Sequence, residues 1–219
     1  MKYKTIIYDL DGTLVDSKKD IFITTNYTIT QMGGTQIPEE TVYKCVGKGV
    51  RDLLLQALPF KDDGAQARAL EIFKAHYLDH CTDHTRLYPH AMETLTALGG
   101  LFVPQAVLTN KPQVYTDKIL KGLGVMHFFS VMIGAESGFP LKPDITAVTH
   151  ILKQCHTTPA EALFVGDSEI DRMTAQNAGM DCALLLGGYT NDAEISAFKN
   201  DRVFVCKDFR EVRELIHRS

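Results

Sequence analysis

From residue 88 onward, short runs of β-branched and aromatic residues alternate with stretches of helical periodicity. The runs predict strands at residues 102–109, 131–134, 162–167, 181–186 and 203–206, and the stretches predict helices at residues 89–98, 113–123, 144–154, 169–178, 193–198 and 209–217. Strands that alternate with helices form a parallel sheet with right-handed crossovers and helices on both faces. In such an open α/β sheet, ligands bind beyond the carboxyl ends of the strands.

The N-terminal part of the chain adds one strand and a block of helices. Residues 4–8 form an uninterrupted β-branched and aromatic run, which is typical of a strand buried on both faces of a parallel sheet. No convincing strand follows before residue 85, and helical patterns occupy residues 17–32, 38–46, 50–58 and 65–81. The simplest architecture is a doubly wound, Rossmann-like α/β core of residues 1–14 and 85–219, with a four-helix cap domain of residues 15–84 inserted into it.

Composition and charge limit the class of partner. The net charge is −4 at pH 7, which leaves no basic field for nucleic acid or acidic lipid, so a small molecule is the expected partner. The five cysteines are odd in number and widely spaced, without a CxxC pair, which favours a reducing compartment over a disulfide framework or a zinc ribbon. No signal-peptide pattern or membrane-spanning apolar run is found. We therefore expect a cytoplasmic protein, either a monomer or a homodimer.

Two carboxylates end the first strand. Asp9 and Asp11 are two residues apart, so strand alternation lets both side chains lean into the space beyond the strand's carboxyl end. Two neighbouring acids repel each other unless a cation or a shared proton relieves them. The pair is therefore a candidate site, although aspartate and glycine are also common at ordinary strand-to-turn junctions.

Three later strand or loop positions carry similar candidates. Thr109 and Asn110 end the second core strand and could hold a phosphate through a hydroxyl and backbone amides, or simply cap the next helix. Lys142 could neutralise a phosphoryl group, or lie on the surface as most lysines do. Asp167 ends another buried strand, with Asp171 one helical turn later, and hard carboxylate oxygens of this kind suit Mg²⁺, although an N-cap cluster would look alike.

Four short motifs, in this order, resemble those of the haloacid dehalogenase superfamily of phosphohydrolases. They are DLDGT at residues 9–13, the threonine of LTN at 109, the lysine of LKP at 142 and GDSxxD at residues 166–171. The resemblance covers nearly the whole chain, including a helical insertion directly after the first motif. Dehalogenase members lack the second acid of the first motif, because a halide leaving group needs no proton. Its presence here as Asp11 favours phosphate chemistry.

The resemblance also implies a role for each motif residue. Asp9 would be the nucleophile that forms an aspartyl-phosphate, and Asp11 would act first as general acid and then as general base. Thr109 and Lys142 would bind the transferring phosphoryl group. The implied cofactor is Mg²⁺, held by four acidic residues, one of them through its backbone carbonyl: Asp9, Asp11, Asp167 and Asp171.

The sequence VGxG followed by LL, together with LTNKP, is similar to the phosphoglycolate phosphatase group. Gly47, Lys48 and Arg51 in the first of these could bind a small anionic tail such as a carboxylate, or form a plain helix-turn-helix with exposed basic residues. The chain departs from the group at His90, where a glycine commonly follows Tyr-Pro, and at Ile145, where a second proline is missing.

Other functions remain open at this point. A phosphosugar mutase of the β-phosphoglucomutase kind, a pyrophosphatase or a nucleotide phosphatase could use the same scaffold, and a non-catalytic binding protein would require the motifs to have lost their use. His76, His80 and His84 recur every four residues and could form a metal face, but no acidic partner is placed as in a metallohydrolase helix. A polar cap surface is the favoured interpretation of these histidines.

Overall fold

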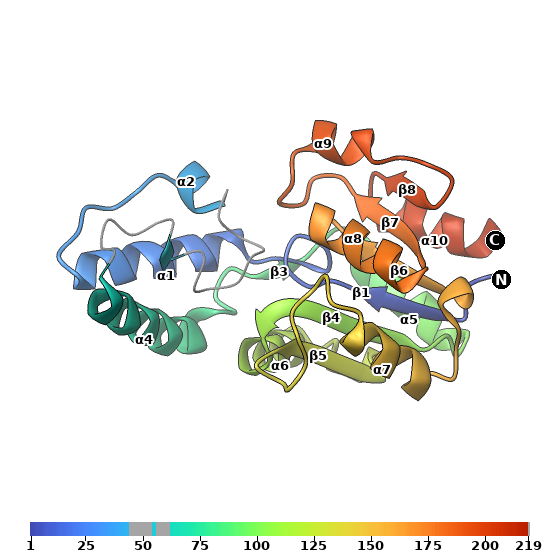
Figure 1. Ribbon diagram of the computed structural model, residues 1–219, viewed down its shortest axis with the longest axis horizontal. Helices are drawn as coiled ribbons and strands as arrows, with labels where there is room; N and C mark the ends of the chain where they lie inside the picture. Colours follow the sequence, from blue (N-terminus) through green and yellow to red (C-terminus); the bar gives the residue numbers. More distant parts are fainter. Residues whose placement is uncertain (44–53, 56–61, 219) are drawn as a thin grey trace.

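The computed structural model describes residues 1–43, 54–55 and 62–218, and its centre is a six-stranded parallel sheet of order β5-β4-β1-β6-β7-β8 (Figure 1). The strands are β1 (Thr5–Tyr8), β4 (Gln105–Pro112), β5 (Val131–Ala135), β6 (Ala162–Gly166), β7 (Asp181–Leu185) and β8 (Val203–Cys206). Every neighbouring pair is parallel. This confirms the predicted α/β fold and places β1, the first strand of the chain, in the middle of the sheet.

Helices cover both faces of the sheet, since β1 sends alternate side chains to two separate buried clusters. Ile6 and Tyr8 pack with α5, α6 and α10, whereas Ile7 packs with α7, α8 and α9. The helices of the core are α5 (Ala91–Gly100), α6 (Gln113–Gly122), α7 (Thr146–Gln154), α8 (Glu169–Ala178), α9 (Asp192–Ala197) and α10 (Phe209–Arg218), with short 3₁₀ turns at η1 (Met126–Phe128) and η2 (Pro159–Glu161). Burial on both faces explains why the strands are continuous apolar runs.

Two element boundaries differ from the prediction for local reasons. The strand expected at residues 102–109 begins later, because the backbone amides of residues 101–103 still close the end of α5, and it extends to Pro112. Helix α5 begins at Ala91 because His90 adopts φ +64°, in the left-handed region. That backbone conformation favours glycine, which gives a physical reason for the glycine common at this position in the phosphoglycolate phosphatase group.

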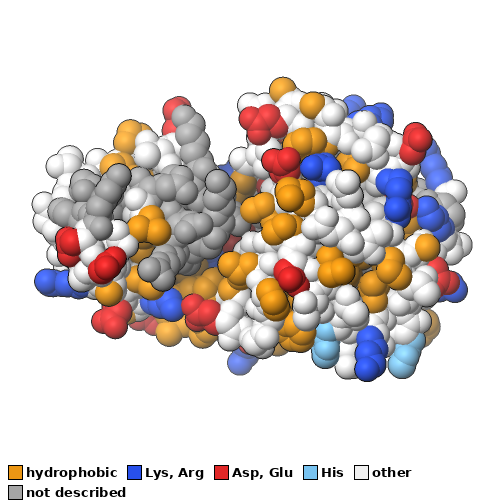
Figure 2. Space-filling model, in the orientation of Figure 1, with side chains coloured by type: hydrophobic (Ala, Val, Ile, Leu, Met, Phe, Trp, Pro, Cys, Tyr) orange, Lys and Arg blue, Asp and Glu red, His pale blue; other side chains and the backbone are white. Residues whose placement is uncertain are grey.

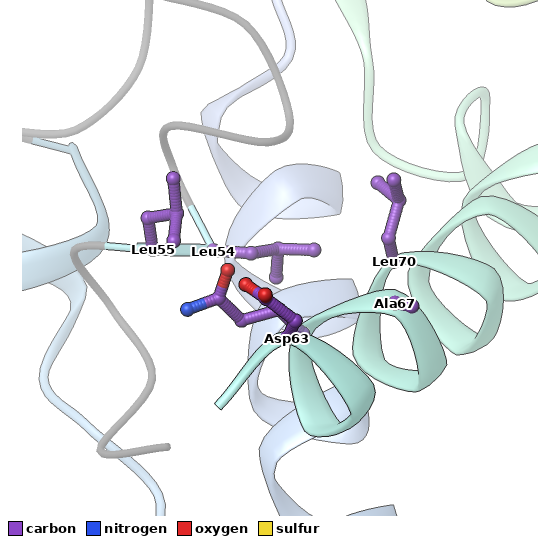
Figure 3. Close-up of a pocket in the computed structure, with 6 residues that line it drawn as sticks. Leu54, Leu55, Asp63, Ala67 and Leu70 are labelled. Atoms are coloured by element: carbon purple, nitrogen blue, oxygen red, sulfur yellow. The ribbon is translucent and has the colours of Figure 1, made fainter. Parts of the chain in front are cut away.

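The helices α1 (Lys18–Gln31), α2 (Glu39–Tyr43) and α4 (Asp63–His80) form a separate unit beside the carboxyl edge of the sheet (Figure 1). Helix α1 packs along α4. A cavity of about 280 Å³ lies in this unit, between residues 54–55 and the first half of α4. Figure 3 shows the residues that line it. A fourth cap helix, predicted at residues 50–58, falls mostly outside the described residues, so the helix count and boundaries of the cap stay predictions.

The chain passes between the two units through a short antiparallel ladder. Val15–Asp16 (β2) pairs with Arg86–Leu87 (β3), with Val15 opposite Leu87 and Asp16 opposite Arg86. The prediction of no strand in residues 15–84 is therefore wrong at its first two residues. A two-residue strand is too short to show alternation in the sequence.

Charged side chains of both signs lie on the surface of the described residues (Figure 2). On the face shown in Figure 2, the described lysines and arginines lie among acidic side chains and form no continuous basic field. None of the described helices is both long and apolar enough to cross a bilayer.

A buried carboxylate joins the two chain segments of this junction. Asp20, in the first turn of α1, is 2% exposed. Its oxygens accept hydrogen bonds from the backbone amides of His84 and Thr85 at 2.8–3.0 Å, and from the Thr85 hydroxyl at 2.8 Å. The side chain therefore fixes the start of α1 to the segment that returns to the sheet.

We expect Asp20→Asn to lower the free energy of unfolding by about 2–3 kcal/mol, because the amide nitrogen cannot accept and faces buried donors. Urea unfolding followed by circular dichroism measures the change. Asp79→Asn, on the exposed side of α4, is the matched control and should stay within about 0.5 kcal/mol of the wild type. Equal stability of the two variants would contradict a fixing role for Asp20.

Candidate active site

Three buried carboxylates from two strand ends meet at the carboxyl edge of the sheet. Asp9 directly follows β1, Asp167 directly follows β6, and Asp171 lies in the first turn of α8. One oxygen from each lies within 4.8 Å of the others. The strands β1 and β6 pair in parallel, which brings these residues together although they are far apart in sequence.

The surroundings of Asp167 leave no freedom to its side chain. The Thr13 hydroxyl donates to Oδ1 at 3.0 Å, and the Tyr189 backbone amide donates to Oδ2 at 2.6 Å. A Cβ added to Gly12 would lie 2.8 Å from Oδ1, and one added to Gly188 would lie 2.5 Å from Oδ2. Only glycine at these two positions lets the backbone come this close to the Asp167 carboxylate. Gly12 also has a φ of +85°, in the left-handed region.

Lys142 lies between two of the carboxylates. Its Nζ is 2.8 Å from Asp9 Oδ1 and 2.7 Å from Asp171 Oδ1, and its side chain is 3% exposed. Burial alone would lower the pKa of Lys142, but the charges of Asp171 and Asp9 outweigh it and raise the pKa above its usual value. The ammonium therefore stays charged, and the alternative interpretation as a surface lysine is wrong.

Asp171 is held at the N-terminus of α8. Its Oδ2 accepts hydrogen bonds from the backbone amides of Asp167 and Ser168 and from the Ser168 hydroxyl, at 2.6–3.2 Å. Its other oxygen is the one that contacts Lys142. One oxygen of Asp171 therefore takes part in the N-cap of α8, and the other takes part in the carboxylate group. The N-cap cluster and the carboxylate group exist together at this strand end.

Thr109 and Asn110 lie within β4 rather than beyond it. The Thr109 hydroxyl accepts a hydrogen bond from the backbone amide of Lys111 at 3.2 Å, in a stretch where the pairing of β4 with β5 is irregular. The Asn110 carboxamide accepts from the backbone amide of Lys142 at 2.8 Å and donates to its carbonyl at 3.2 Å. These two bonds position the loop that carries the buried lysine. Contact of Asn110 with a substrate stays a prediction.

Asp11 has a partner that sequence analysis missed. Lys111 Nζ lies 3.0 Å from both Asp11 oxygens and 2.7 Å from the hydroxyl of Tyr77, which comes from α4. Asp11 Oδ1 also accepts from the Ser17 hydroxyl at 2.5 Å, and that hydroxyl lies 2.8 Å from the hydroxyl of Tyr189. Regular strand alternation would predict Lys111 on the same side of the strand as Thr109, so the sequence held a signal for a second lysine at this strand end.

The acidic group has the chemistry of a divalent-cation site. Burial raises the pKa of Asp9 despite the nearby Lys142, and burial followed by the charges of Asp171 and Asp9 raises the pKa of Asp167. Asp9 Oδ1 is buried and accepts no well-directed hydrogen bond from the described residues, although the Lys142 ammonium lies close. A cation among these oxygens would relieve both the repulsion and the missing contact, and carboxylate oxygens are the ligands that Mg²⁺ prefers. The residues present therefore fit the ion.

The predicted cap residues have different outcomes. Gly47, Lys48 and Arg51 lie outside the described residues. His76 stacks on Tyr27 with ring centroids 4.0 Å apart, and its ring is tilted against that of His80 at 4.3 Å. These are packing contacts within a polar surface, as favoured above. His84 contributes its backbone amide to the Asp20 contact.

Comparison with known proteins identifies the family. Residues 6–185 match the family model described as haloacid dehalogenase-like hydrolase. The phosphoglycolate phosphatase of Aquifex aeolicus is 35% identical over 186 residues, which cover 85% of this chain and 86% of the relative. That of Mannheimia succiniciproducens is 31% identical and covers 98% of this chain and 99% of the relative. A crystal structure of a predicted phosphoglycolate phosphatase from Haemophilus somnus superposes with a TM-score of 0.91 at 30% identity, covering 99% of both chains.

The family match extends over most of the chain and includes the strand ends that carry the acidic group. The relatives cover the helical unit as well as the sheet, since their alignments reach nearly the full length of this chain. The resemblance of the four motifs is confirmed, and the chain belongs to the haloacid dehalogenase-like hydrolase family.

Proposed function

We propose that this chain is a Mg²⁺-dependent phosphatase that hydrolyses a small phosphate monoester, with phosphoglycolate as the first candidate. The observation that carries the proposal is the meeting of Asp9, Asp167 and Asp171 around the buried ammonium of Lys142 at the carboxyl edge of the sheet. The names of the relatives support phosphoglycolate as the substrate. We further propose that the protein works in the cytoplasm as a monomer or a homodimer.

The chemistry assigned to the residues proceeds in two displacements. A carboxylate oxygen of Asp9 attacks phosphorus, and the bond from phosphorus to the ester oxygen breaks as Asp11 gives that oxygen a proton. Asp11 then takes a proton from water, which attacks the aspartyl-phosphate and releases inorganic phosphate and free Asp9. Asp11 precedes β2 at the junction of the two units, so it can face both the phosphoryl group and the leaving oxygen.

Binding of the phosphoryl group falls to Thr109 and Lys142. Phosphoryl transfer depends mainly on positioning and charge neutralisation, and a buried ammonium 2.8 Å from the nucleophile suits both. Mg²⁺ would be held by the side chains of Asp9 and Asp167 and the backbone carbonyl of Asp11, with Asp171 in support. When bound, it supplies positive charge that offsets the negative charge of the carboxylates and of the substrate.

We propose that residues 15–84 act as a cap over this site. The cap would exclude water and choose the substrate, because its helices lie next to the carboxyl edge of the sheet (Figure 1). Tyr77 of α4 already contacts Lys111 of the sheet, which supports a cap that reaches the reacting groups.

A panel of phosphate esters with Mg²⁺ tests the proposed function. We expect release of inorganic phosphate from 2-phosphoglycolate, and a fall of at least about 100-fold in kcat/KM after chelation, because the metal supplies several kcal/mol of charge stabilisation. Adding Mg²⁺ back should restore the rate. Hydrolysis that is unchanged by chelation would contradict the metal's role.

The same panel separates the alternatives. Transfer of the phosphoryl group to a second hydroxyl with little free phosphate would indicate a phosphosugar mutase. Preference for pyrophosphate or nucleotides would indicate those activities, and no turnover of any ester would favour a binding protein.

A further inference from the structure

A second buried lysine lies on the leaving-group side of the proposed reaction. Lys111 is the penultimate residue of β4, its side chain is 4% exposed, and its Nζ lies 3.0 Å from both oxygens of Asp11. It is separate from Lys142, which contacts Asp9 and Asp171. Lys111 is therefore paired with the proposed acid, Asp11, and Lys142 with the proposed nucleophile, Asp9. Of the two lysines, only Lys142 has a role in the chemistry proposed above.

The charge of Lys111 is retained despite its burial. Burial alone would lower the pKa of Lys111, but Asp11 and Tyr77 outweigh it and raise the pKa above its usual value. A buried ammonium needs anionic or hydrogen-bonding partners, because an uncompensated charge in the protein interior is costly. Any step that takes Asp11 away from Lys111 therefore requires another anion to replace it.

The position of Lys111 limits where such an anion can come from. If Asp11 protonates the leaving oxygen, as proposed, that oxygen lies within hydrogen-bond distance of an Asp11 carboxyl oxygen. Lys111 Nζ contacts the same carboxyl group. A substituent one or two bonds from the leaving oxygen therefore comes within reach of the ammonium, and a carboxylate there matches it in charge.

We propose that Lys111 recognises a carboxylate next to the leaving oxygen of the substrate, and gives up its ion pair with Asp11 in doing so. The inference rests on the proposed phosphatase function and names the substrate class as phosphate monoesters of 2-hydroxy carboxylates. The proton that Asp11 gives the ester oxygen is transferred as the Asp9–phosphorus bond forms and the phosphorus–oxygen bond breaks, and the attacking water returns a proton to Asp11 in the second displacement.

Tyr77 is a positioning residue in this arrangement. Its hydroxyl lies 2.7 Å from Lys111 Nζ, and its ring centroid lies 4.7 Å from the same atom. Tyr77 is buried on α4, so this contact with the ammonium comes from the helical unit. The Lys111 ammonium thus has a fixed contact that remains while its anionic partner is exchanged.

The experiment compares 2-phosphoglycolate with ethyl phosphate, which lacks the carboxylate. We expect Lys111→Met to lower the ratio of kcat/KM for the two esters about 10- to 100-fold, the value of a hydrogen bond to a charged group. The ratio removes any effect of the variant on Asp11 that is common to both esters. Lys118→Met is the matched control, because Lys118 also joins the core to α4, through the Leu78 carbonyl, without contacting Asp11. Its ratio should equal that of the wild type.

A second variant covers the case in which Lys111→Met does not fold. Tyr77→Phe keeps the ring and the lysine, and should lower the same ratio about three- to ten-fold because it removes one hydrogen bond to the ammonium. Its control is Tyr115→Phe, whose hydroxyl contacts the Lys74 carbonyl at 3.3 Å and whose ring packs against Tyr77.

The equilibrium affinity of the two esters provides a readout that is independent of turnover. In an Asp9→Asn background, calorimetry should show that Lys111→Met weakens binding of 2-phosphoglycolate about 10-fold more than binding of ethyl phosphate. A wild-type enzyme that hydrolyses 2-phosphoglycolate while both Lys111→Met and Tyr77→Phe keep the wild-type ratio would overturn the inference and leave the phosphatase function standing. A wild type that hydrolyses neither ester would overturn the proposed function itself.

Discussion

Asp9→Asn is expected to lower kcat for phosphate ester hydrolysis by at least about 10⁴-fold, because an amide oxygen cannot form the aspartyl-phosphate. Steady-state release of inorganic phosphate with saturating Mg²⁺ measures the loss. Asp117→Asn is the matched control: this half-buried aspartate on α6 accepts a hydrogen bond from Gln113, which an asparagine oxygen can still accept, so only the charge is removed and full activity should be retained. Undiminished turnover by Asp9→Asn would remove Asp9 as the nucleophile.

The same variant should be more stable than the wild type when metal is chelated. Burial raises the pKa of Asp9, so the ionised carboxylate costs folding free energy at pH values above that raised pKa and costs nothing below its ordinary range. At pH 8 the neutral amide removes this cost, and we expect a gain of about 1–2 kcal/mol in the free energy of unfolding. At pH 3, below the ordinary pKa of an aspartate, the difference should vanish. A variant that loses activity while its free energy of unfolding rises has lost its nucleophile, whereas a variant with a damaged fold would lose both activity and stability.

Lys142→Met is expected to lower kcat/KM by about 10³-fold, since it removes a fixed positive charge from the place where negative charge develops. It also leaves Asp9 and Asp171 without their shared cation. We expect the free energy of unfolding in chelator to fall by about 3–5 kcal/mol, which is typical when one partner of a buried ion pair is removed. Addition of Mg²⁺ should recover part of that stability, because the ion replaces some of the lost charge.

Chemical denaturation with and without Mg²⁺ measures the stability effect, and phosphate release measures the rate. Lys118→Met is again the matched control, with a change in stability of no more than about 0.5 kcal/mol. Wild-type kcat/KM in Lys142→Met would show that the ammonium takes no part in phosphoryl binding.

The sequence predicted the acidic group because the rules involved are local. Asp9 and Asp167 each follow a continuous apolar run, and parallel strands bring their carboxyl ends to one edge of the sheet. Predicting the position of each residue required only the sequence of its own strand and of the turn that follows it. The buried position of Lys142 was suggested only by motif order, since nothing in its own loop distinguishes it from a surface lysine.

The contact of Tyr77 with Lys111 could not be predicted in the same way. Helix α4 and strand β4 are far apart in sequence, and their contact depends on how the helical unit packs against the sheet, which no local pattern encodes. In the sequence, Tyr77 has the spacing of an ordinary residue on the apolar face of an amphipathic helix. The β2–β3 ladder could not be predicted for a different reason: each of its strands has two residues, which is too few to show a periodic pattern.

The ladder formed by β2 and β3 has a consequence for how such proteins diversify. Residues directly opposite each other in an antiparallel pair have Cα atoms about 5 Å apart, so the polypeptide departs from the sheet and rejoins it at almost one point. Replacing everything between the two strands with a segment of another length would demand no stretching of the framework. Recombination at Asp16 and Arg86 would therefore exchange the proposed cap, including Tyr77, while Lys111 and the proposed reacting residues of the core stay in place.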